Sequence, residues 1–155
     1  MGRALDRETA RLLGRELRRA KALGVAAGAL RHRDLSRKRL EARLAARGAS
    51  AGARAEALAT LERAGLVDDE RVAVSRAQAL AGRGYGDAAV RHALEGEGLE
   101  PADVRAGLAA LEPEADRARV LLARRGEGPK AIRWLAARGF DVSTLENLGG
   151  FADGA

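Results

Sequence analysis

The sequence predicts an all-α protein built from three tandem three-helix modules of helix-turn-helix type, arranged as an elongated, curved array. A helical segment recurs three times, and capping residues or prolines stand at nearly every predicted helix end. No stretch shows the period-two alternation of β-branched and aromatic residues that is typical of strands. The 155 residues include one Trp, one Tyr and two Phe, and small apolar side chains suit thin cores between closely packed helices.

The repeat places an apolar residue, Leu four positions later and Gly four positions after that. Its copies are residues 40–48, 90–98 and 131–139. This spacing predicts a short amphipathic helix that ends at a glycine. The first two copies are followed by a leucine pair at matching distances, Leu58 and Leu61 or Leu108 and Leu111. After the third copy, Gly149 and Gly150 shorten the next helix, as is typical of the last unit of a repeat array.

Serine and aspartate residues mark the helix starts in the first half of the chain. Ser36 is predicted to cap a helix that runs to about Arg47, and Ser50 or Ala51 to start one that ends at Gly65. Asp68 or Asp69 would cap the next helix, which ends before residues 82–86.

Prolines mark the helices of the second half. Asp87 is expected to cap a short helix to Glu97, whereas Pro101 and Pro129 fit the first turns of two others. Pro113 separates a helix that ends at Leu111 from one that spans 114–125.

These helices group into three modules with an extension at each end. The predicted parts are a basic N-terminal helix or flexible extension (1–21), three-helix modules at 22–66, 67–112 and 113–149, and a disordered tail (150–155). A module of this size buries little core alone, so neighbouring modules should stack.

Charge is unevenly distributed along the chain. The formal net charge is +6, and 25 of the 28 basic residues are Arg, whose planar fork suits phosphate or carboxylate. Residues 1–48 carry a net +9, residues 49–113 a net −4 and residues 114–155 a net +1. We therefore expect an acidic partner, with a solvated, partly self-neutralised surface as the alternative.

The composition also limits compartment and chemistry. Cysteine is absent, which excludes disulfides and thiolate sites and favours a reducing compartment. No apolar run is long enough for a membrane span, so we expect a cytoplasmic protein with no membrane partner. His32 and His92 fall in different modules, and glycine loops of the nucleotide-binding type are absent. We expect neither an enzyme nor a bound cofactor or metal.

Three local features have two interpretations each. The acidic run 68–70 could bind a divalent cation, but its place before a helix favours capping. Residues 82–86, Gly-Arg-Gly-Tyr-Gly, could approach a phosphate, although a tight turn with Tyr85 on the core is favoured. Trp134 could stack on a base, but a lone Trp in a small helical module is more often a packing residue.

The predicted helix 36–47 is strongly basic. It carries Arg37, Lys38, Arg39, Arg43 and Arg47, which would suit DNA phosphates in a helix-turn-helix reader. The matching helix, 87–97, is mostly acidic, so part of the array is better suited to protein contact.

Five motifs in register give the sequence a resemblance to a known family. They are Arg33-Asp-Leu-Ser36, Gly65-Leu-Val-Asp-Asp69, Arg83-Gly-Tyr-Gly86, the Val90 to Gly98 repeat and Leu135-Ala-Ala-Arg-Gly-Phe140. Over about residues 25–150 the chain resembles the RecX family of recombinase regulators. The family's tandem three-helix modules agree with the repeat. The chain departs from the family pattern at Val72 and Arg76, where aromatic residues are usual, and this predicts a thinner core in the second module.

The resemblance implies a regulator that binds the RecA filament on single-stranded DNA and inhibits its ATPase, strand-exchange and co-protease activities. Such a protein would act in homologous recombination, DNA repair and the SOS response, as a monomer. The candidate contacts with the filament or DNA are Arg33, Arg37, Arg39, Arg43, Arg47, Arg83, Tyr85, Arg91, Lys130 and Arg133. A helix-turn-helix protein that acts directly on DNA, if only weakly, and a helical-repeat adaptor for another protein remain as alternatives.

Overall fold

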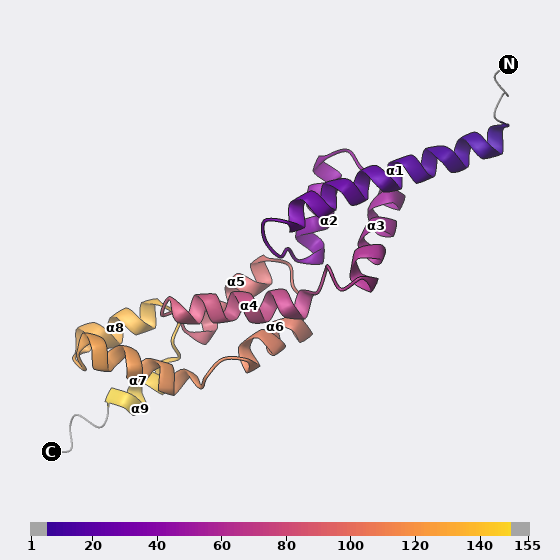
Figure 1. Cartoon of the computed structure of the whole chain (residues 1–155). Coiled ribbons are helices and arrows are strands. Elements are labelled where there is room, and N and C mark those ends of the chain that lie inside the picture. The colour runs from indigo at the N-terminus through magenta and orange to yellow at the C-terminus, as the bar shows by residue number, and fades with distance from the viewer. Residues whose placement is uncertain (1–5, 150–155) are drawn as a thin grey trace. The chain divides into compact units, whose positions relative to one another are not determined.

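The computed structural model describes residues 6–149, which form nine helices and no strand (Figure 1). The helices are α1 (Arg7–Leu30), α2 (Arg37–Ala46), α3 (Ala51–Arg63), α4 (Asp69–Gly82), α5 (Asp87–Gly96), α6 (Pro101–Ala109), α7 (Glu114–Arg125), α8 (Pro129–Ala137) and α9 (Val142–Gly149). The all-α prediction is confirmed. The chain divides into two compact units, residues 1–69 and 70–155. The tail predicted at 150–155 lies outside the described residues.

The first unit packs α1, α2 and α3 around one cluster of buried side chains. Its core combines alanines of α1 with leucines of α2 and α3, among them Ala26, Leu40, Leu44 and Leu58, which are fully buried. Alanine on α1 lets the helices approach closely, which accounts for the small side chains in the composition.

Helix α1 continues without a break across the boundary predicted after residue 21. Gly24 does not interrupt it: a Cβ added there would meet nothing within 4 Å, and the cost of an exposed helical glycine is only about 1 kcal/mol. Burial begins at Ala22, so the first part of α1 adds nothing to the core.

The second unit contains two clusters of buried side chains. One joins α4, α5 and α6 through residues such as Val90, Leu94 and Val104. The other joins α7, α8 and α9 around Leu135 and Leu145. The three-module division and its curved arrangement stay predictions.

The three repeat copies end in the same backbone structure. Gly48, Gly98 and Gly139 have φ angles of 77°, 77° and 83°, in the left-handed region that favours glycine. The residue after each glycine donates its backbone N–H to the carbonyl of the repeat leucine. These pairs are Ala49 with Leu44 at 3.1 Å, Leu99 with Leu94 at 3.4 Å and Phe140 with Leu135 at 3.2 Å. The repeat therefore encodes one helix-ending motif three times.

Two of the predicted caps are confirmed and one is wrong. The hydroxyls of Ser36 and Ser50 accept backbone N–H groups at 3.2 and 3.3 Å at the starts of α2 and α3. At α5 the capping residue is Gly86, and Asp87 is the first helical residue. Asp87 does not cap because its carboxylate pairs with Arg117 instead.

Of the two positions where the chain lacks family aromatics, Arg76 lines a hollow in the second unit. Val72 is buried, but Arg76 is half exposed and binds Glu97 at 2.9 Å. A hollow of about 270 Å³ lies between Arg76 and Leu94. An aromatic side chain at this edge would have filled part of that space.

Candidate functional site

The ten candidate contact residues divide equally between the two units. Arg33, Arg37, Arg39, Arg43 and Arg47 lie in the first, and Arg83, Tyr85, Arg91, Lys130 and Arg133 in the second. All are exposed except Tyr85, which is half-buried. Within the units, the structure brings together the arginines of α2 and the pair Arg83 and Tyr85.

Three arginines form what we call the α2 basic face: Arg39, Arg43 and Arg47. They are spaced four residues apart, which places them along one side of the helix. Leu40 and Leu44, both fully buried, fix the orientation of this side relative to the core. The face can bind phosphate or carboxylate groups.

Arg37, at the start of α2, is engaged within the first unit. Its Nε lies 2.7 Å from a carboxylate oxygen of Glu62, and its backbone N–H donates to Asp69 at 2.7 Å. The Asp69 carboxylate thus accepts a backbone N–H at the N-terminus of α2. This contact gives one residue of the acidic run 68–70 a structural role. Arg37 holds α2 against α3 and is a poorer candidate contact than its neighbours.

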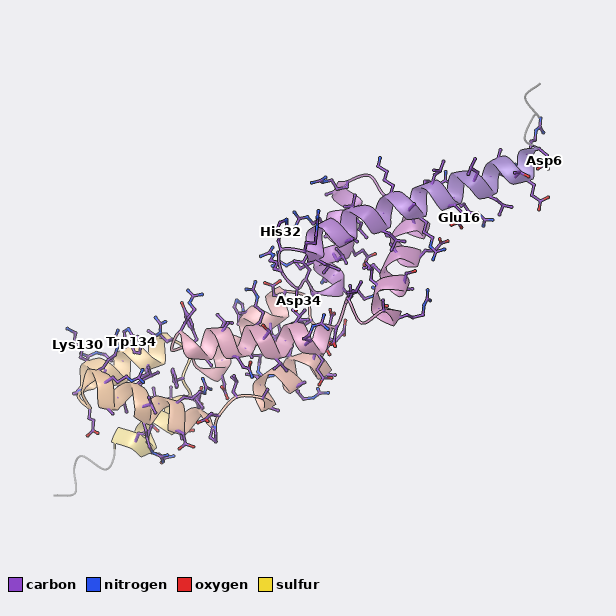
Figure 2. The ribbon with its side chains drawn as sticks, in the orientation of Figure 1. Asp6, Glu16, His32, Asp34, Lys130 and Trp134 are labelled. Atoms are coloured by element: carbon purple, nitrogen blue, oxygen red, sulfur yellow. The ribbon has the colours of Figure 1, made fainter. Side chains whose placement is uncertain are left out.

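Arg33 lies in the loop between α1 and α2, whose residues His32 and Asp34 are labelled in Figure 2. Arg91 lies on the exposed side of α5. Among the described residues, neither forms a hydrogen bond or ion pair with another candidate residue of its unit.

The loop 83–86 forms a tight turn between α4 and α5. Gly84 is buried and has a φ of 82°, and Tyr85 packs against the buried cluster of α4, α5 and α6. The guanidinium of Arg83 lies 5.7 Å from the centre of the Tyr85 ring. The tight-turn interpretation accounts for each of these residues.

Arg138, which was not a candidate, binds this loop from the end of α8. Its Nε donates to the carbonyl of Gly84 at 2.9 Å, and a terminal nitrogen donates to that of Arg83 at 2.8 Å. Its guanidinium also lies 4.2 Å from the ring centre of Tyr85. One side chain therefore satisfies two loop carbonyls while it stacks on the aromatic ring.

Backbone pairing reinforces this contact. Gly86 donates to the carbonyl of Arg138 at 2.9 Å, and Ala88 donates to that of Gly139 at 3.1 Å. A Cβ on Gly86 would come within 2.3 Å of the Gly139 carbonyl oxygen. Only glycine allows the two backbones to approach this closely.

Arg117, on α7, also binds the loop. It donates to the carbonyl of Tyr85 at 2.9 Å and forms an ion pair with Asp87, and its own side chain is only 12% exposed. The loop is thus held by Arg117 and Arg138, and the spacing of the sequence gave no signal that either would reach it. Arg138 does fall within the last motif of the family resemblance.

Glu114 bridges two helix N-termini in the same region. One carboxylate oxygen accepts from the backbone N–H of Asp87 at 2.6 Å, and the other from that of Asp141 at 3.1 Å. Asp141 in turn accepts hydrogen bonds from the hydroxyl of Ser143 and the backbone N–H of Thr144, and these hold its pKa below the ordinary 3.8. The negative charges of Glu114 and Asp141 stabilise the N-termini of α5 and α9, where the helix dipole is positive.

Trp134 packs against the cluster of α7, α8 and α9, as the packing interpretation expects. The guanidinium groups of Arg125 and Arg138 lie 3.7 and 4.7 Å from its ring. Lys130 lies on the same helix (Figure 2), beside an open hollow next to Trp134, and Arg133 is exposed on α8. Two guanidinium groups therefore already lie close to the ring on which a base would have to stack.

The described residues hold no cluster of metal-binding side chains. No three His, Asp or Glu residues of 6–149 gather in a way that could hold an ion. None of the helices in that range is both long and apolar enough to cross a membrane. The described residues therefore form small helical units with an arginine-rich surface.

No protein-family model matches the chain. A protein of Xanthomonas oryzae pv. oryzae (strain MAFF 311018) named "Regulatory protein RecX" is 35% identical over 150 residues, which cover 90% of this chain and 94% of the relative. A protein of the same name from Stenotrophomonas maltophilia (strain K279a) is 38% identical over 130 residues, or 77% of this chain and 80% of the relative.

Two solved structures have the same fold. The crystal structure of RecX from Lactobacillus salivarius matches with a TM-score of 0.75 and 17% identity, over 88% of this chain and 97% of that one. A crystal structure of regulatory protein RecX matches with a TM-score of 0.80 and 21% identity, over 96% of this chain and 81% of that one.

Proposed function

Since the chain belongs to the RecX family of regulatory proteins, we propose that it binds the RecA filament on single-stranded DNA and inhibits the filament's ATPase, strand-exchange and co-protease activities. The observation that carries the proposal is the 35% identity to a named regulatory protein over 90% of the chain. In this proposal the protein works as a monomer in the cytoplasm, by binding and without catalysis or a cofactor.

The repeated helix-ending motif supports a binding mode based on several weak contacts. Each copy fixes a short helix on its own small core. Linked modules can contact successive protomers of a filament, and the linkage gives avidity without a single strong site. A filament of protein on DNA also offers acidic and basic surfaces to a chain whose charge changes sign along its length.

The α2 basic face, made of Arg39, Arg43 and Arg47, is the contact we favour in the first unit. Its arginines are exposed, and the helix that carries them is fixed by buried leucines. In the second unit, Arg91, Lys130 and Arg133 are exposed, whereas Arg83 and Tyr85 take part in the contact with Arg138. We therefore assign filament contact to Arg91, Lys130 and Arg133. We assign structural support to Arg83 and Tyr85.

The test is DNA-dependent ATP hydrolysis by the cognate RecA while the protein is titrated in. We expect hydrolysis and strand exchange to fall as the protein approaches the filament concentration. Activity that stays unchanged at a stoichiometric excess would contradict the proposal.

A charge-matched pair of variants locates the contact. Arg39→Gln with Arg43→Gln should raise the concentration needed for inhibition by about tenfold, the change that 1.4 kcal/mol of lost binding energy produces. Arg105→Gln with Arg124→Gln removes the same charge from exposed positions outside the candidate set and should leave inhibition unchanged. Equal effects of the two pairs would mean that only net charge matters.

A further inference from the structure

An apolar row runs along one side of α1 and is exposed over its whole length. Its members are spaced alternately three and four residues apart, which is the heptad spacing of a coiled-coil seam. Leu13 and Leu17 are 49% and 62% exposed, and the other members are exposed as well. We call the row the α1 seam; it consists of Ala10, Leu13, Leu17, Ala20, Gly24 and Ala27.

The seam lies on the side of α1 that faces away from the core. The buried residues of the helix are Ala22, Ala26 and Ala29. At about 3.6 residues per turn they lie opposite the seam. The outer side of a helix packed on a core is normally charged or polar, so an apolar outer side is not explained by packing within the first unit.

We propose that the α1 seam of one chain pairs with the α1 seam of a second copy, with the two helices antiparallel. The proposed function has the protein act on the filament as a monomer, so the dimer is a form of the free chain. It goes beyond that function and does not depend on it.

The side chains of the seam are complementary in size when two copies run antiparallel. In a symmetric pair, a two-fold axis between residues 18 and 19 sets Leu13 opposite the second copy's Gly24 and Leu17 opposite its Ala20. Each leucine then meets a small residue. A Cβ on Gly24 would meet nothing within 4 Å, so the surface in front of it is open to a leucine. A parallel pair would set leucine against leucine at one end and glycine against glycine at the other.

Opposite charges close the antiparallel seam at both ends. Asp6 and Arg31 continue the heptad spacing, four residues before Ala10 and four after Ala27, and both are exposed. The same two-fold axis sets Asp6 opposite the second copy's Arg31, and the reverse pair follows by symmetry. Figure 2 shows Asp6 at the free end of the helix. Parallel helices would bring like charges together at each end, so the charges also select the antiparallel direction.

Arg31 is available for this pairing. Among residues 6–149 it forms no ion pair. Its backbone N–H ends α1 by donating to the carbonyl of Ala27, and this contact leaves the guanidinium unused.

A second copy would support the part of α1 that its own unit leaves uncovered. Figure 1 shows the N-terminal half of α1 extending beyond α2 and α3. A helical segment of this length is marginally stable in water when nothing packs on it. In the antiparallel pair, Leu13 and Leu17 would lie on Ala20 and Gly24 of the second copy, where α1 is held by its own core.

The composition of the seam favours a second helix over a membrane surface. Binding to a bilayer grows with the apolar area that is inserted, and the seam has only two large side chains. Glu16 borders the seam and would be repelled by anionic lipid. Alanine and glycine instead allow the close approach of another helix.

The first experiment is sedimentation of the full chain over a series of protein concentrations, without RecA or DNA. We expect the average mass to rise from that of a monomer towards that of a dimer. Leu13→Glu places a charge in the seam and should weaken dimerisation by about tenfold or more. Leu12→Glu is the matched control: Leu12 is also 49% exposed but lies outside the seam, so this variant should dimerise like the parent. Leucine and glutamate have similar helix propensities, so the helicity of both variants should match the parent.

Cysteine cross-linking tests the direction of the pair. The chain contains no cysteine, so each introduced thiol is unique. A mixture of the Leu13→Cys and Gly24→Cys variants should be linked by a short bis-maleimide reagent. Leu13→Cys alone should not be linked, because its two thiols would be about 16 Å apart along the helices.

Three results would overturn the proposal. The first is a monomer at every concentration, whether or not the chain binds phosphatidylserine vesicles. The second is an equal loss of dimer in Leu12→Glu and Leu13→Glu. The third is efficient linking of Leu13→Cys alone, or none in the mixture.

Inhibition of RecA separates this proposal from the proposed function. The seam contains none of the filament contacts assigned above, so Leu13→Glu should inhibit like the parent chain. Weaker inhibition by Leu13→Glu with an unchanged mass would assign the seam to the filament and overturn the dimer. A chain that dimerises but does not inhibit RecA would contradict only the proposed function.

Discussion

Arg138 stacks on Tyr85, with its guanidinium carbon 4.2 Å from the ring centre, while its Nε donates to the neighbouring Gly84 carbonyl at 2.9 Å. The two residues are far apart in sequence: Tyr85 packs against the buried cluster of α4, α5 and α6, whereas Arg138 lies between Leu135 and Phe140 of the cluster of α7, α8 and α9. Their contact makes the glycine-rich loop a joint between the two clusters. A motif that could have been a ligand site is therefore explained by the fold.

Replacing Arg138 by lysine tests this joint. Lysine keeps the charge but cannot donate to both carbonyls in a plane while it stacks on the ring, so we expect Arg138→Lys to lower the free energy of unfolding by about 1–2 kcal/mol. Denaturant unfolding measures the change. Arg133→Lys, at an exposed position of the same helix, should stay within about 0.5 kcal/mol of the parent. Equal stabilities of the two variants would show that the contact contributes nothing.

The close backbone approach at Gly86 predicts a larger loss. In Gly86→Ala the new Cβ would lie 2.3 Å from both the Gly139 oxygen and the Phe140 nitrogen, so the backbones must separate. We expect destabilisation of about 3 kcal/mol or more.

Gly24→Ala is the matched control for Gly86→Ala. Its Cβ would meet nothing within 4 Å on an exposed part of α1, and it should stabilise the chain by about 0.5–1 kcal/mol. Circular dichroism during thermal unfolding compares the two, and a tolerated alanine at Gly86 would refute the close approach.

Leu94 tests the repeat itself. It is fully buried and its carbonyl accepts the hydrogen bond that ends the second repeat helix. Leu94→Ala should cost about 2–5 kcal/mol in unfolding free energy. Val120, which is 51% exposed, supplies the comparison: Val120→Ala should change stability by less than about 0.5 kcal/mol. A loss at Leu94 no greater than that at Val120 would show that the leucine is not a core residue.

Local signals predicted the helices well, because a cap or a glycine acts on residues close to it in sequence. Ser36 and Ser50 cap as expected, and the repeat glycines end their helices with positive φ. Asp87 was misassigned because an Asp before a helix can also pair with a distant cation, here Arg117. No local pattern distinguishes these two uses.

The candidate site was harder to predict, because exposure and partners depend on tertiary structure. Among the ten candidates, Arg37 is bound to Glu62, and Tyr85 is held by Arg138. Conversely, Arg117 and Arg138 bind the loop 83–86, although no local spacing in the sequence places either residue beside it.

The depressed pKa of Asp141 predicts a pH dependence. Hydrogen bonds from Ser143 and Thr144 favour the charged carboxylate, so the folded chain binds a proton at Asp141 less readily than the unfolded chain does. The stability that this group contributes is complete above its ordinary pKa of 3.8 and is lost as pH falls through the lower, folded pKa.

An NMR titration of the Asp141 carboxyl carbon measures that pKa directly. We expect a midpoint below 3.8 in the parent chain, and a midpoint closer to 3.8 in Ser143→Ala, which removes the hydroxyl donor. A parent midpoint at or above 3.8 would contradict the hydrogen-bonded geometry at the start of α9.

Co-sedimentation with RecA filaments on single-stranded DNA tests the central claim most directly. The salt concentration is set so that bare DNA no longer retains the protein, because direct phosphate contact weakens steeply with salt. We expect the protein to pellet with the filament and to stay in the supernatant with DNA alone. Recovery in the supernatant with the filament present would contradict it.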